Sequence, residues 1–112
     1  MALTSAPLVE NLTISEIKKG LEAGSILVVD VREAHEFEAG HIPNSVLVPL
    51  STFHIGDIPD SNGRRIVLSC RSGRRSLTAA ELAFEQGMSI DAHYAGGFLD
   101  WVQHGEPVDQ GL

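Results

Sequence analysis

The 112-residue sequence contains a single cysteine, Cys70, so it can form neither an intramolecular disulfide nor a cysteine-rich zinc site. No stretch approaches the roughly 18 consecutive apolar residues that a membrane helix requires, which argues against a membrane-spanning protein. Basic residues are scarce: eight Lys and Arg stand against fifteen Asp and Glu, and the net charge of −7 argues against nucleic acid as a partner. The five histidines show no short metal-ligand spacing, so we expect no metal site and no cofactor.

The composition indicates a folded protein. A hydrophobic content of 43% is too high for a disordered chain, and 112 residues is an ordinary length for one domain. We therefore expect a single domain over residues 1–112. The first seven residues show no basic region followed by an apolar run, which is the pattern of a secretory signal, so a cytoplasmic location is expected.

Apolar periodicity and capping residues predict strands that alternate with helices. Thr13 and Glu16 form a capping-box pattern at the start of a helix that ends before Gly24. Short apolar runs rich in β-branched residues predict strands at residues 25–30, 45–48, 65–69 and 90–94. Further helices are predicted at residues 33–38, 76–86 and 98–104. Such alternation favours right-handed crossovers, a mostly parallel sheet and the α/β class.

The few basic residues are unevenly placed. Five of the eight fall within a window of twelve residues: Arg64, Arg65, Arg71, Arg74 and Arg75. One compact arginine cluster in an acidic protein suggests a local anion site. A solvated basic loop is the alternative, and charge alone does not decide between them.

Cys70 lies where an α/β protein places its site, because it ends the strongest predicted strand and a helix follows. Gly73 allows the positive φ that a cradle of inward-pointing amides needs. The helix amino terminus contributes a partial positive charge of about half a unit, and the three arginines of segment 70–75 add full charges. Each effect favours the thiolate, so Cys70 is predicted to be a reactive nucleophile and not an inert core residue.

With these motifs the sequence resembles the rhodanese-like domains, also known as single-domain thiosulfate sulfurtransferases. The resemblance extends over roughly Leu12 to Gly105. It rests on residues 29–33 (VDVRE) with 36–37 (EF), on 40–43 (GHIP), on 70–75 (CRSGRR), and on Gly96-Gly97 with Trp101. It implies an α/β fold with a central parallel sheet and helices on both faces. One departure is Asn44-Ser45, where relatives usually carry Gly-Ala in a turn.

The resemblance also implies a mechanism. The Cys70 thiolate would take a sulfane sulfur from a donor such as thiosulfate and pass it to a thiophilic acceptor, which is cyanide, a thiol or a protein. The loop expected to hydrogen-bond the persulfide and bind the donor consists of Arg71, Ser72, Gly73, Arg74 and Arg75. Within it, Arg71 and Arg74 are the candidates to bind a sulfonate. For Arg75 a bracing role and a binding role are both open.

Two further residues and two other functions belong to this interpretation. Asp30 and Arg32 match the family's Asp-x-Arg element, and we expect them to support the loop by hydrogen bonding. A sulfur carrier or binding module without efficient turnover is the main alternative function. Phosphatases and arsenate reductases of the same fold are a remote one, since their loops resemble a pattern with five residues between cysteine and arginine, whereas four separate Cys70 from Arg75.

Overall fold

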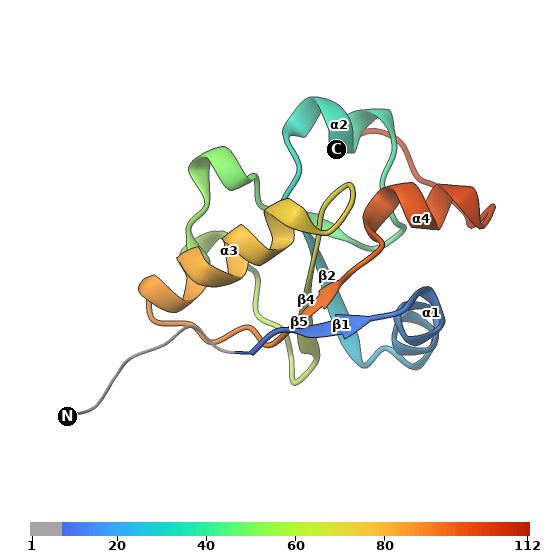
Figure 1. Cartoon of the computed structure of the whole chain (residues 1–112). Coiled ribbons are helices and arrows are strands. Elements are labelled where there is room, and N and C mark those ends of the chain that lie inside the picture. The colour runs from blue at the N-terminus through green and yellow to red at the C-terminus, as the bar shows by residue number, and fades with distance from the viewer. Residues whose placement is uncertain (1–7) are drawn as a thin grey trace.

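Five parallel strands form the centre of the protein in the computed structural model, which describes residues 8–112 (Figure 1). Their order in the sheet is β1–β5–β4–β2–β3. The strands are β1 (Glu10–Leu12), β2 (Ile26–Asp30), β3 (Val46–Leu47), β4 (Arg65–Ser69) and β5 (Ala92–Tyr94). Every pairing between these strands is parallel, so the predicted α/β class with a mostly parallel sheet is confirmed.

Residues 8–112 also form four α-helices and two short 3-10 helices, and the last α-helix follows the last strand. They are α1 (Ile14–Ala23), α2 (Ala34–Ala39), η1 (Leu50–Thr52), η2 (Ile55–Asp57), α3 (Arg74–Glu85) and α4 (Gly97–Gln103). The predicted capping box at α1 is present, because Thr13 Oγ1 accepts from the Glu16 amide and the Glu16 carboxylate accepts from the Thr13 amide. None of the helices in residues 8–112 is long and apolar enough to cross a membrane.

The structure differs from the sequence-based prediction mainly at element ends. Strand β1 was not predicted, because it has only three residues and only Leu12 among them is buried, so it shows no apolar run. Helix α3 begins at Arg74, two residues before the predicted start, since Gly73 takes the N-cap position. Strand β3 covers two of the four residues predicted for it.

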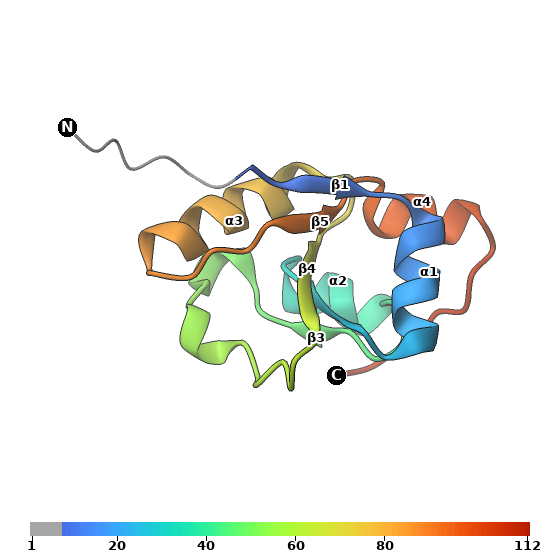
Figure 2. The same ribbon diagram turned by 90° about the horizontal axis from the view of Figure 1, so that it is seen from below.

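Helices cover both faces of the sheet, as predicted, with α3 on one side and α1 and α4 on the other (Figure 2). Alternate strand residues enter the two cores. Leu68 packs with the α3 alanines Ala79, Ala80 and Ala83, whereas Val67 packs with Ile17, Tyr94 and Trp101. Strand β4, which leads into Cys70, is therefore packed on both of its faces.

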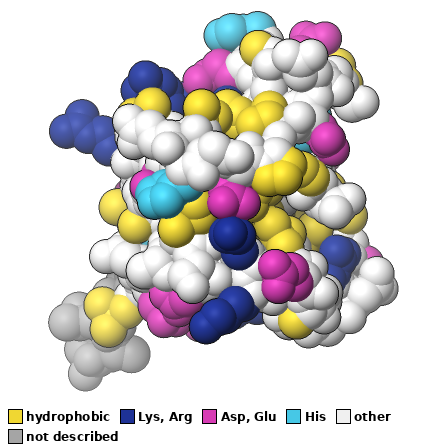
Figure 3. Space-filling model, turned by 90° about the vertical axis from the view of Figure 1, so that its right-hand side faces the viewer, with side chains coloured by type: hydrophobic (Ala, Val, Ile, Leu, Met, Phe, Trp, Pro, Cys, Tyr) yellow, Lys and Arg dark blue, Asp and Glu magenta, His cyan; other side chains and the backbone are white. Residues whose placement is uncertain are grey.

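The side of the molecule formed by α1 and α4 carries charges of both signs (Figure 3). Acidic, basic and hydrophobic side chains are interspersed there, and Lys18 forms an ion pair of 3.1 Å with Glu106. This side has no continuous basic stripe of the kind that follows a nucleic-acid backbone.

Candidate active site

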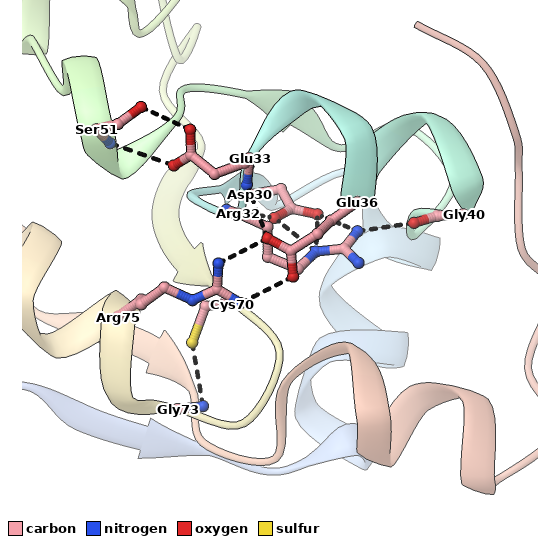
Figure 4. Close-up of polar contacts among 9 residues, drawn as sticks. All are labelled: Asp30, Arg32, Glu33, Glu36, Gly40, Ser51, Cys70, Gly73 and Arg75. Carbon is pink, nitrogen blue, oxygen red and sulfur yellow. Dashed lines mark hydrogen bonds and ion pairs between the residues drawn. The ribbon is translucent and has the colours of Figure 1, made fainter.

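Cys70 follows the last residue of β4, and the loop after it turns directly into α3 (Figure 4). Its side chain is 1% exposed, and the Gly73 amide donates a hydrogen bond of 3.1 Å to the Cys70 sulfur. Gly73 has φ 93°, the positive value expected for it, and a Cβ there would collide with the carbonyl oxygen of Ala95. The loop conformation therefore requires glycine at this position.

The surroundings of the sulfur favour the thiolate. Burial by itself would raise the pKa of the Cys70 thiol, but hydrogen bonding with the backbone and side chain of Ser76 and with the amides of Ser72 and Gly73 outweighs it. The net effect lowers the pKa of Cys70, because these donors compensate the negative charge where water is excluded. The sulfur thus lies in a nest of N–H groups at the amino terminus of α3.

Ser76 is a site residue that the sequence interpretation missed. Its Oγ lies 3.6 Å from the Cys70 sulfur and 2.7 Å from Nδ1 of His93, and both Ser76 and His93 are buried. The helical pattern does indicate it, because Ser76 lies on the same helical face as the apolar Ala79, Ala80 and Ala83. A serine on that face places a polar side chain in the core beside the cysteine, where it needs a hydrogen-bond partner. Nothing in the local pattern indicated His93 as its partner.

The three loop arginines have different surroundings. Arg75 donates to both oxygens of Glu36 on α2, at 2.7 and 2.9 Å, so its guanidinium braces the start of α3 against α2 (Figure 4). Arg71 and Arg74 are exposed. Of the two roles left open for Arg75, this geometry favours bracing, and the two exposed arginines are available to a ligand.

Asp30 and Arg32 form a buried pair at the end of β2. Arg32 Nη2 lies 2.8 Å from Asp30 Oδ2 and donates at 2.7 Å to the Gly40 carbonyl. The Arg32 guanidinium also lies over the ring of Phe98, 4.2 Å from its centroid. Asp30 and Arg32 were expected to hydrogen-bond to the Cys70 loop, but Arg32 donates to Asp30 and Gly40 instead. Their contact with the loop is indirect and passes through Phe98, whose amide donates to the Cys70 carbonyl.

Gly97 lets the start of α4 approach the Cys70 loop closely. It has φ 66°, and a Cβ there would lie 2.6 Å from the Cys70 carbonyl oxygen. The amides of Phe98 and Leu99 donate to the carbonyls of Cys70 and Arg71, at 2.8 and 3.0 Å. These two hydrogen bonds tie the loop carbonyls to α4, while the Gly73 amide of the loop points at the sulfur.

Comparison with known proteins identifies the class that this fold and site define. Residues 13–104 match the rhodanese-like domain family, and since the match covers most of the chain, the protein belongs to that family. The resemblance noted from the sequence motifs is thereby confirmed.

Several relatives carry sulfurtransferase names. The mouse thiosulfate sulfurtransferase/rhodanese-like domain-containing protein 3 is 32% identical, over 92% of this chain and 73% of the relative. A sulfurtransferase of Allochromatium vinosum is 32% identical, over 74% of this chain and 78% of its own length. The chain spans 56% of an uncharacterized Synechocystis protein that is 33% identical to it.

A solved structure supports the fold assignment. The rhodanese-related protein from Thermoplasma volcanium superimposes with a TM-score of 0.73 at 27% identity, and the match covers 89% of this chain and 97% of that one.

Among the described residues 8–112, no group of three or more His, Cys, Asp or Glu is placed to hold a metal ion.

Proposed function

We propose that the protein is a sulfurtransferase that works through a persulfide on Cys70. The Cys70 thiolate attacks the outer sulfur of thiosulfate, the S–S bond of the donor breaks, and sulfite leaves with the bonding electron pair. The Cys70 persulfide then gives its outer sulfur to a thiophilic acceptor, and the thiolate is restored. Cyanide, a small thiol or a sulfur-accepting protein each has the chemistry to be that acceptor.

The observation that carries the proposal is the nest of donors around the Cys70 sulfur. Ser72, Gly73 and Ser76 direct hydrogen-bond donors at it, and α3 begins at the same place. Such a nest stabilises a sulfur anion both before and after the outer sulfur is added, by the logic of an oxyanion hole. The sulfurtransferase names of two relatives support the same reaction class.

Arg71 and Arg74 are the residues we assign to the sulfonate of the donor. Both are exposed at the loop that carries Cys70, and a guanidinium offers forked donors to sulfonate oxygens. Arg75 is a weaker candidate, because its guanidinium already donates from both terminal nitrogens to Glu36.

The phosphatase alternative is weaker on the same ground. A closing arginine that forks a tetrahedral phosphate would have to share its donors, because Arg75 already makes two hydrogen bonds to Glu36. The carrier alternative shares the persulfide and differs only in turnover. Because the sequence has one cysteine, the persulfide has no second thiol within the chain and must pass its sulfur to another molecule.

Intact mass spectrometry of the purified protein tests the proposal. Incubation with thiosulfate is expected to add one sulfur atom, and cyanide is expected to remove it with release of thiocyanate over many turnovers. Loading without turnover would identify a carrier instead. No loading from thiosulfate or from a polysulfide would refute the persulfide mechanism.

A further inference from the structure

A chain of hydrogen bonds leads from the Cys70 sulfur through the core to the edge of the sheet. Ser76 Oγ lies 3.6 Å from the sulfur, 2.7 Å separate Ser76 Oγ from His93 Nδ1, and 2.6 Å separate His93 Nε2 from Asn11 Oδ1. Ser76 and His93 are 0% and 2% exposed, whereas Asn11 is exposed on β1. The sulfur transfer steps described above give no role to this buried histidine.

The Ser76 hydroxyl has one proton, and this restricts the chain. Asn11 Oδ1 accepts, so His93 Nε2 carries a hydrogen. When His93 is neutral, Nδ1 is then an acceptor, the Ser76 proton points to it, and Ser76 Oγ presents a lone pair to the sulfur. That arrangement suits a Cys70 thiol, which donates to Ser76 Oγ, and it repels a thiolate.

A protonated His93 reverses every donor. Nδ1–H then donates to Ser76 Oγ, and the Ser76 hydroxyl turns its proton to the sulfur. The thiolate gains a donor and loses a facing lone pair. Thiolate formation at Cys70 and protonation of His93 therefore favour each other through a single hydroxyl.

We propose that His93 takes up the proton released by Cys70, relayed by Ser76. The S–H bond breaks with its electron pair left on sulfur, the proton passes to Ser76 Oγ, and the original hydroxyl proton passes to His93 Nδ1. His93 never touches the sulfur; it is a positioning residue that aims the Ser76 hydroxyl. The inference rests on Cys70 being the nucleophile of the proposed function.

Among the groups packed around His93, the Cys70 thiolate is the charge to which its ring is linked by hydrogen bonds, through Ser76. The register neighbours of His93 are Asn11 on β1 and Leu68 on β4, and Ser76 approaches from α3. Charged groups of the adjoining elements are directed elsewhere. Glu10 and Asp91 pair with Arg65, Arg75 pairs with Glu36, Asp100 accepts from Tyr94, and Arg74, Glu81 and Glu85 are exposed.

Two opposing effects act on His93. Burial lowers the pKa of His93, because the imidazolium is poorly solvated in the core. A thiolate two hydrogen bonds away opposes this effect, and the two groups then titrate as a coupled pair. The pair holds two protons at low pH, one at intermediate pH as thiolate and imidazolium, and none at high pH.

The pH dependence of Cys70 alkylation by iodoacetamide is the first test. The wild type is expected to show two inflections, the second where His93 deprotonates and the Ser76 hydroxyl turns away from the sulfur. Ser76→Ala and His93→Asn should each leave one inflection, and in Ser76→Ala its midpoint should rise by about one pH unit. The controls are Thr78→Ala, exposed on α3, and His35→Asn, exposed on α2, which should retain the wild-type profile.

The reciprocal measurement is the titration of His93 by imidazole ¹⁵N NMR. Linkage requires that the thiolate raise the pKa of His93, so Cys70→Ala should lower its midpoint by about one pH unit or more. Asn11→Asp, at an exposed position, should raise the midpoint of the His93 titration, because a carboxylate then accepts from Nε2. This variant provides a second test if His93→Asn fails to fold. An identical His93 titration with and without Cys70, or a wild-type alkylation profile in Ser76→Ala, would overturn the relay. Neither readout needs sulfur transfer, so the relay and the proposed reaction can fail separately.

Discussion

Arg75 and Glu36 meet through two parallel hydrogen bonds, Nη1 to Oε1 at 2.7 Å and Nη2 to Oε2 at 2.9 Å. This fork joins the first turn of α3, next to Cys70, to α2. Hydrogen bonding by Arg75 lowers the pKa of the Glu36 carboxyl to about 2 against the cost of partial burial. Arg75, in the first turn of α3, therefore holds the loop in place.

Glu36→Gln is expected to destabilise the fold by about 1–2 kcal/mol at pH 7, since it removes the charge from a partly exposed bidentate pair. Because the folded pKa of Glu36 lies below its ordinary value of 4.5, the stabilisation is present above pH 4.5 and is lost as the pH falls toward 2. Urea unfolding of both proteins at pH 7 and pH 3 measures this. Glu38→Gln, exposed on the same helix, is the control. A difference between wild type and Glu36→Gln that does not shrink with acid would contradict the assignment.

Gly97→Ala should disrupt the loop much more than an equally strained glycine elsewhere. Gly97 and Gly24 have φ 66° and 65°, but a Cβ at Gly97 meets the Cys70 carbonyl, whereas one at Gly24 meets nothing within 4 Å. Gly24→Ala is expected to cost about 1 kcal/mol for the left-handed backbone alone. Gly97→Ala should cost more and also slow thiocyanate formation, which urea unfolding and a cyanide assay measure. If Gly97→Ala and Gly24→Ala had the same effect on stability and the same effect on activity, the close approach at Gly97 would not be needed.

Cys70→Ser is expected to abolish sulfur transfer and leave the fold intact. The serine hydroxyl fits the same nest and keeps the hydrogen bond from Gly73, so stability should change by no more than about 1–2 kcal/mol. Its oxygen cannot form a persulfide. Thiocyanate release gives the activity, and circular dichroism with thermal unfolding gives the fold. Residual turnover of thiosulfate by the serine variant would show that the sulfur is carried elsewhere.

Arg74→Ala should raise the KM for thiosulfate by about tenfold, the effect of losing one charge-assisted contact of about 1.4 kcal/mol. The KM for an uncharged sulfane donor should change little, because it has no sulfonate to bind. Lys19→Ala removes the same charge from an exposed position on α1 and serves as the control. Equal increases for the two donors would remove Arg74 from sulfonate binding.

Much of this protein could be predicted from local sequence. Periodicity and caps were sufficient for α1, for the strands that became β2 and β4, and for the α/β class. The position of Cys70 between a strand and a helix, with Gly73 after it, indicated the anion nest, because those interactions lie within six residues of the sulfur. The ends of the elements and the three-residue strand β1 could not be predicted from the sequence, since short segments carry no periodicity.

The sequence by itself thus determined the loop that surrounds Cys70 and indicated Cys70 as the candidate nucleophile, because backbone conformation there depends on neighbouring residues. Only the tertiary structure decided what lies behind that loop. Arg75 meets a carboxylate 39 residues away, and His93 meets Asn11 across 82 residues. The first pairing exists because the sheet places β4, which leads into α3, beside β2, which leads into α2, and the second because it places β1 beside β5. Strand order follows from the burial of whole elements against each other, and no local pattern encodes it.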